Sequence, residues 1–143
     1  MSISPEKAAD LHIKHLEMLQ SAIARISNYN ATLKNYCITL TSAICGFAIT
    51  LKNPIVILLA LLPITILAIL DAQYLRTERQ FRTLYEHARL EEWGTIPSFD
   101  MNVSKMPRSS FWGAFFSWSV CSFYLPLLIG IVAVMLIVWK YYV

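Results

Sequence analysis

The feature that most constrains this fold is an uncharged apolar run that passes without a break into a charged segment. The run, PIVILLALLPITILAIL, extends from Pro54 to Leu70, and the segment after it, DAQYLRTERQFRTLYEHARLEEW, ends at Trp93. No Gly or Pro lies between Ile64 and Trp93, so one helix can continue beyond the apolar part. At helical rise, residues 55–75 span roughly 30 Å, the thickness of a bilayer core. We therefore predict a membrane span fused to a cytoplasmic helical stalk.

The composition agrees with a protein embedded in a membrane. The chain is 57% hydrophobic and only 15% charged, whereas soluble domains carry about 25% charged residues. The apolar residues gather in three blocks, Tyr36–Leu51, Pro54–Leu70 and Phe111–Val138. The first block follows a charged amphipathic segment, so we do not expect a signal peptide. The fold class predicted is an all-α integral membrane protein with three transmembrane helices.

Three regions follow from these blocks. Residues 1–35 are predicted as an amphipathic cytoplasmic helix, with Ser4 as its N-cap and Pro5 in the first turn. Residues 36–93 form a transmembrane hairpin, whose second helix is kinked by a proline at mid-membrane and continues into the cytoplasmic stalk. Residues 94–143 hold a cytoplasmic loop, an interfacial aromatic helix and the third span, with Pro126 marking the bend between the last two.

The positions of the basic residues predict the orientation. Lys7, Lys14, Arg25 and Lys34 precede the first block, and Arg76, Arg79, Arg82, Arg89, Lys105 and Arg108 lie between the second and third. Only Lys52 and Lys140 of the twelve fall on the other side. Because basic loops stay in the cytoplasm, we expect the N-terminus on the cytoplasmic side of the membrane and the C-terminus on the other side.

The N-terminal helix carries a heptad-like apolar seam. Its candidate oligomer residues are Leu16, Leu19, Ile23, Ile26 and Asn30. One interpretation is self-association, with Asn30 fixing the register across an oligomer axis. The other is an amphipathic helix that lies on the inner leaflet or against the Phe81–Trp93 part of the stalk.

Small and polar residues follow one side of the first predicted span. These are Thr39, Ser42, Gly46 and Thr50. They permit close helix packing in lipid, and they would equally suit a hydroxyl-lined pore. Asp71, the first acid after the apolar run, is costly at the membrane boundary unless it is hydrated or paired. It is either a gate charge, with its partner on another helix, or a hydrated interfacial acid.

The stalk carries a stripe of arginines whose forked guanidinium groups suit phosphate. The candidates for ligand binding or stalk coupling are Arg76, Arg79, Arg82 and Arg89. A salt-bridged face exposed to solvent is the alternative, since acids balance the bases in this region. No phosphate loop, metal-ligand spacing or nucleophile–base arrangement occurs, so we expect no enzyme activity, no cofactor and no metal.

The stalk also carries a resemblance to a known family. The segment Leu70–Tyr85, LDAQYLRTERQFRTLY, is similar to the L-D-A-x-Y-L-R-x-E-R-x-F-R-x-L-Y signature of a family of small bacterial three-span membrane proteins. The segment Ile23–Asn28 resembles the helix that enters that family's first span. Such proteins occur in bacterial antiviral operons beside nucleotidyltransferases or reverse transcriptases, and the membrane effector of the Hailong defence system is a relative.

The resemblance implies an oligomeric anti-phage effector that depolarises or permeabilises the inner membrane. A nucleotide or oligonucleotide made by a neighbouring enzyme would control it. We expect a homo-oligomeric ion channel, because three spans are too few to enclose a pore alone. The alternatives are a non-conducting membrane anchor that recruits a soluble partner through the stalk, and a holin-like toxin that disrupts lipid without a defined pore.

Overall fold

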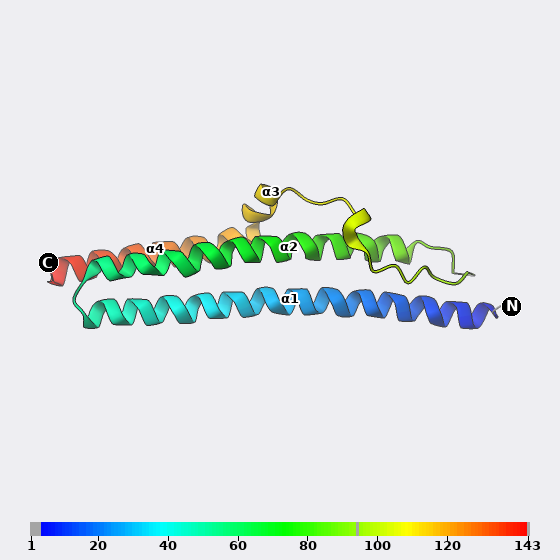
Figure 1. The fold of residues 1–143 in the computed structure, drawn as a ribbon, viewed down its shortest axis with the longest axis horizontal. Coiled ribbons are helices and arrows are strands. Elements are labelled where there is room, and N and C mark those ends of the chain that lie inside the picture. Colours follow the sequence, from blue (N-terminus) through cyan, green and yellow to red (C-terminus); the bar gives the residue numbers. More distant parts are fainter. Residues whose placement is uncertain (1–3, 94, 143) are drawn as a thin grey trace.

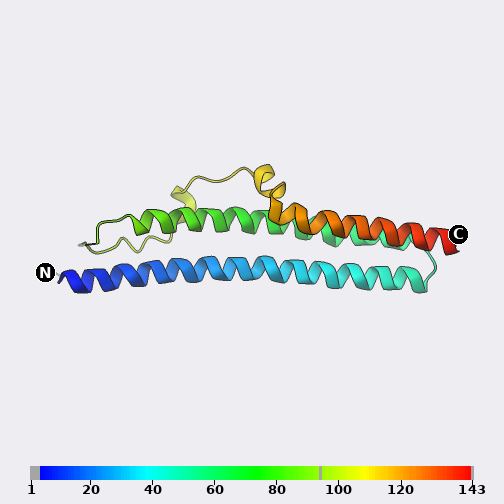
Figure 2. The ribbon, with the colours of Figure 1, turned by 180° about the vertical axis from the view of Figure 1, so that it is seen from behind.

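The computed structural model describes residues 4–93 and 95–142, which form a long rod of helices (Figure 1). The helix α1 (Pro5–Thr50) runs the length of the rod. The chain then turns and comes back along it as the 3-10 helix η1 (Pro54–Ala60) and α2 (Leu61–Arg89). The last helix, α4 (Trp118–Tyr142), lies beside α2 at the end of the rod where the chain turns (Figure 2). No strand occurs in the described residues.

The N-terminal region and the first apolar block form one unbroken helix. At about 1.5 Å per residue, the 46 residues of α1 are more than twice as long as a bilayer core is thick. The predicted start is confirmed, because the Ser4 side chain accepts a hydrogen bond from the Lys7 backbone amide and Pro5 opens the first turn. The sequence between Pro5 and Thr50 contains no proline, and the helix continues through residue 36.

A tight turn joins α1 to the helical segment that returns along it. Lys52 has a φ of 53°, in the left-handed region, and the Asn53 side chain accepts from the Ile55 amide at 3.0 Å. The chain starts back as a 3-10 helix and becomes α-helical only at Leu61. Pro63 lies in the first turn of α2. Backbone N–H groups in the first turn have no acceptor within the helix, so a proline there costs less than one in the helix interior.

The helix α2 ends at Arg89, four residues before the predicted end of the stalk at Trp93. The amides of Leu90 and Glu91 turn back to the carbonyls three residues earlier, which tightens the backbone and closes the helix. This early exit lets the Trp93 ring stack on His12 of α1, with ring centroids 4.5 Å apart.

The C-terminal block bends earlier than the sequence predicts. After the short 3-10 helix η2 (Val103–Lys105) come α3 (Phe111–Phe115) and, across residues 116–117, α4. The amides of Val120 and Cys121 both donate to the Ser117 carbonyl, so α4 starts its own hydrogen-bond ladder there. Pro126 lies inside α4. The prediction of a bend at Pro126 is therefore wrong.

Two apolar cores lie along the rod. The three-helix core, among α1, η1, α2 and α4, is built from Cys37, Ala48, Ile57, Ala60, Ile64, Ala68, Val120, Tyr124, Ile131 and Val138. The two-helix core, between α1 and the second half of α2, centres on Leu19, Leu84 and Ala88, and loop residues such as Met101 and Met106 pack against it.

The outer surface around the three-helix core is apolar. Two helical segments of the described chain, Pro54–Arg89 and Trp118–Tyr141, are long and apolar enough to cross a membrane. Their most apolar stretches are only 33% and 17% buried, whereas a core helix of a soluble protein is mostly covered. Phe47, Leu62 and Leu136 are each more than 60% exposed. Residues 36–51, the predicted first span, form the end of α1 and its turn and are not one of these two segments.

Candidate functional site

Three helices meet at a buried carboxylate. Asp71 follows the last apolar turns of α2, and its side chain is only 1% exposed. The Lys34 ammonium of α1 lies 3.5 Å from its Oδ2. A buried carboxylate needs such a partner because its desolvation is otherwise uncompensated. The partner of Asp71 thus comes from another helix, as the gate interpretation expected, but the sequence did not identify it as Lys34.

Lys34 also holds the third helix. Its Nζ donates to the Ser119 carbonyl at 3.2 Å and to the Ser119 hydroxyl at 3.3 Å, and it lies 5.8 Å from the centre of the Phe123 ring. The buried Tyr124 hydroxyl of α4 faces the Asp71 carboxylate. One ammonium group therefore ties α1 to both α2 and α4.

A second buried acid lies two turns further along α2. Glu78 is 7% exposed and accepts from Asn30 of α1 at 3.5 Å. Arg82 donates to the other oxygen of Glu78 at 2.6 and 2.9 Å. We call the five residues Asn30, Lys34, Asp71, Glu78 and Arg82 the polar layer. It separates the three-helix core from the two-helix core.

The predicted oligomer seam packs within the chain. Leu19 is fully buried against Leu84 and Ala88, with Leu16 beside it, and Ile23 and Ile26 are half-buried. Asn30 hydrogen-bonds to the chain's own Glu78. The N-terminal part of α1 thus lies against the second half of α2, as the second interpretation of its pattern expected. Contacts within one chain therefore already cover much of the apolar seam.

The small polar stripe of the first predicted span is exposed. Thr39, Ser42, Gly46 and Thr50 all face away from the neighbouring helices. The hydroxyls of Thr39 and Thr50 donate to carbonyls four residues earlier in α1, and a Cβ added at Gly46 would meet no atom within 4 Å. Within one chain the stripe is therefore not a packing surface. The opposite face, with Cys37 and Thr41, is the buried one.

The stalk arginines do not converge on one point. Arg82 pairs with Glu78, and Arg89 pairs with Glu86 at 2.7 Å. Arg76 donates to the backbone carbonyl of Ser109, just before α3, and Arg79 is half-buried. Arg82 also lines an open groove of about 670 Å³ between α1 and α2, together with Gln20, Ser27, Tyr85 and Glu86.

Two histidines that the sequence analysis missed hold the end of α2 and the loop that follows it. The His12 Nε2 lies 2.8 Å from the Ala88 carbonyl, and the His15 Nε2 lies 3.3 Å from the Asp100 carbonyl. Both side chains are at most 1% exposed. The signal was present, because His12 falls on the apolar seam of the N-terminal helix. From the sequence alone, a histidine at this position is interpreted as a polar break in the apolar seam, because its hydrogen-bond partner, the Ala88 carbonyl, is not known.

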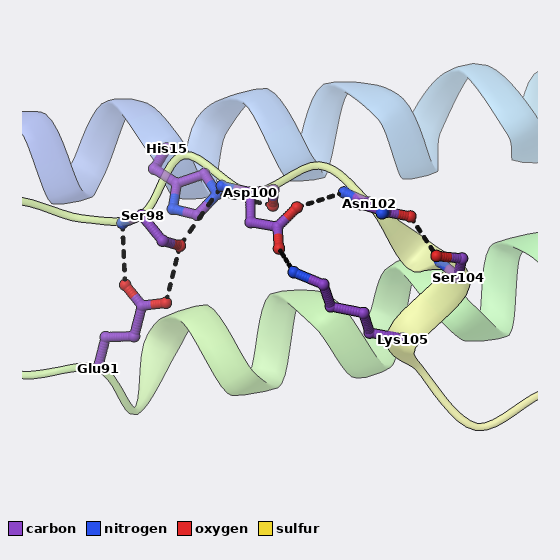
Figure 3. Close-up of polar contacts among 7 residues, drawn as sticks. All are labelled: His15, Glu91, Ser98, Asp100, Asn102, Ser104 and Lys105. Carbon is purple, nitrogen blue, oxygen red and sulfur yellow. Dashed lines mark hydrogen bonds and ion pairs between the residues drawn. The ribbon is translucent and has the colours of Figure 1, made fainter.

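Several hydrogen bonds shape the loop after α2 (Figure 3). Asp100 accepts from the Asn102 amide at 2.8 Å and from the Lys105 ammonium at 2.9 Å. Glu91 accepts from the hydroxyl and, at 3.5 Å, the amide of Ser98. The Lys105 ammonium and the Asn102 amide hold the pKa of the Asp100 carboxyl below its usual range.

The described residues contain no group of three His, Cys, Asp or Glu side chains placed to hold a metal ion. Comparison with protein-family models, with curated proteins and with solved structures found no match to this chain.

The polar layer predicts unequal effects of removing its two central charges. Lys34→Met should destabilise the fold by about 3 kcal/mol, because Asp71 stays buried without a cation. Asp71→Asn should cost less, because Lys34 is 22% exposed, still binds Ser119 and reaches solvent. Unfolding by denaturant in detergent micelles, followed by circular dichroism, measures both. Equal losses from the two variants, or no loss from Lys34→Met, would contradict this assignment.

The Asp100 turn predicts an acid transition in the loop. Because its folded pKa is depressed, the carboxylate stabilises the turn above the ordinary aspartate pKa of about 3.9, and this contribution is lost as the pH falls through the lower, folded value. The Asn102 amide resonance should therefore titrate below pH 3.9 or so. Lys105→Gln should move that midpoint upward. A midpoint that Lys105→Gln leaves unchanged would show that the ion pair does not hold the turn.

Proposed function

We propose that this chain crosses a bacterial inner membrane three times. The end of α1, the segment from η1 to the middle of α2, and α4 would be the spans. The apolar outer surface supports this placement. The turn after α1 and the C-terminus lie at one end of the rod, and the N-terminus lies at the other (Figure 1). Ten of the twelve basic residues would then be cytoplasmic.

Within this membrane placement, the chain acts as a subunit of a homo-oligomeric ion channel. The observation that carries the proposal is the exposed stripe of Thr39, Ser42, Gly46 and Thr50, which no other part of the described chain covers. Helices in lipid associate through small residues, which let their backbones approach closely. Copies of the chain would bring these stripes together around a pore.

The polar layer would be the gate of this channel. It lies where the apolar surface ends and the stalk begins, at the cytoplasmic mouth of the proposed pore. Because α2 continues without a break from Leu61 to Arg89 through Asp71, a tilt of the stalk would move Asp71 relative to Lys34. A ligand that binds the tilted and upright stalks unequally would shift the channel between open and closed.

The biological setting proposed is anti-phage defence, and it rests on the resemblance of the Leu70–Tyr85 segment. A nucleotide or oligonucleotide made by a neighbouring enzyme would be the signal. The groove beside Arg82 is the place on the stalk that fits it best, because small side chains such as Ala24 and Ser27 leave it open next to a guanidinium group. Phosphate would compete there with Glu78 for Arg82.

The channel predicts discrete unitary currents from the purified oligomer in planar bilayers. With the native cysteines replaced by alanine, Ser42→Cys should let a charged methanethiosulfonate reagent reduce the current. Leu40→Cys is the matched control, since Leu40 is exposed on another face of α1, which would face lipid, and the charged reagent should leave its current unchanged. The oligomeric state is measured in the same preparation.

A silent bilayer from a well-folded oligomer, with and without candidate oligonucleotides, would overturn the channel in favour of the non-conducting anchor. Leakage without unitary steps would favour the holin-like toxin. A monomer at all concentrations would exclude a pore of any defined size. If the reagent reduced the current of Leu40→Cys and not that of Ser42→Cys, the channel proposal would stand, but the pore would be lined by a different face of α1.

A further inference from the structure

An apolar groove lies on the outside of the rod, where α2, α3 and α4 meet. Its volume is about 270 Å³, and its walls include Ile64, Thr65, Ala68, Phe115, Val120 and Leu128. It lies beside the end of the three-helix core that is nearest the polar layer, next to the aromatic residues Phe115 and Phe116. In the described chain nothing fills it, so its lining lacks the dispersion contacts of a packed interior.

The surroundings of the groove decide which kind of molecule can fill it. On the membrane placement proposed above, the groove opens sideways into hydrocarbon, where the molecules at hand are lipid acyl chains. Trp112 and Phe116, at its α3 edge, are 64% and 67% exposed. Exposed aromatic side chains of this kind are typical of the level of the lipid headgroups. The groove therefore runs from headgroup level toward the middle of the bilayer.

A cation lies near the α3 wall of the groove, separated from it by Phe111, whose ring stacks on that of Phe115 with centroids 5.8 Å apart. Arg76 lies over the Phe111 ring, 5.9 Å from its centre. Its Nε donates to the Ser109 carbonyl and its Nη1 to the Gln73 side chain, each at 3.0 Å. Its Nη2 makes no hydrogen bond to the described residues. The guanidinium group is thus fixed in place by two bonds and keeps one nitrogen for a further acceptor.

We propose that this groove binds one acyl chain of an anionic phospholipid whose phosphate accepts from Arg76. The proposal rests on the membrane placement, but not on conduction. The bound chain would pack against the Tyr124 ring, which lines the groove while its hydroxyl faces Asp71. Lipid at this site would therefore brace α4 next to the contact between Lys34 and Asp71.

The test counts the lipids that the purified protein retains. Protein in micelles with equal amounts of dioleoylphosphatidylglycerol and dioleoylphosphatidylcholine is analysed by native mass spectrometry. The wild type should keep phosphatidylglycerol in preference to phosphatidylcholine. Thr65→Trp, which fills the groove from its exposed rim, should lose the bound lipid. Ile66→Trp is the matched control, because Ile66 is 51% exposed on the next position of α2 and does not line the groove.

A second variant tests the headgroup contact without filling the groove. Arg76→Gln should weaken retention of phosphatidylglycerol by about tenfold, as expected for one hydrogen bond to a charged group. It should also reduce the preference over phosphatidylcholine, because the choline cation of that lipid is repelled by Arg76 in the wild type. Equal retention of the two lipids by the wild type, or equal loss in Thr65→Trp and Ile66→Trp, would overturn the lipid site. Neither result would bear on the channel, whereas a protein that stays dispersed without detergent would reject the membrane placement itself.

Discussion

The structure depends on the need of one buried carboxylate for a cation. Asp71 is placed by α2 where the apolar surface ends, and its side chain has almost no contact with solvent. A charge in that position is stable only when paired and hydrogen-bonded. Lys34 supplies the pairing from α1 and at the same time binds Ser119 at the start of α4. The register of α1 on α2 and the position of α4 are thus set by the same ammonium group.

The polar layer divides the rod into parts with different surfaces. On one side, three helices expose large apolar side chains and bury a core that mixes small residues such as Ala60 with larger ones such as Ile57 and Tyr124. On the other side, two helices and a loop bury Leu19 and Leu84, and their exposed faces are charged. Because α1 and α2 are continuous through the layer, displacement of one part is passed to the other. This continuity is what a ligand-controlled pore would require of its subunit.

Much of the helical organisation could be read from the sequence, because it depends on local patterns. The absence of Gly and Pro after Ile64 predicted the continuous α2, and Ser4-Pro5 predicted the start of α1. The contacts between helices could not be read in the same way. Lys34 looked like one more basic residue on the cytoplasmic side, and nothing local shows that it faces Asp71 or Ser119. The bend at residues 116–117 was missed because a serine, not Pro126, starts the ladder of α4.

If Lys34 holds α4 against the α1–α2 pair, its removal should change a distance across that joint. Spin labels at Ile69 of α2 and Ser122 of α4, both exposed, can be introduced in a background in which the native cysteines are replaced by alanine. Pulsed electron paramagnetic resonance on the protein in nanodiscs should give one narrow distance distribution, which Lys34→Met broadens or displaces. Conversely, an unchanged distribution in Lys34→Met would show that apolar packing alone positions α4.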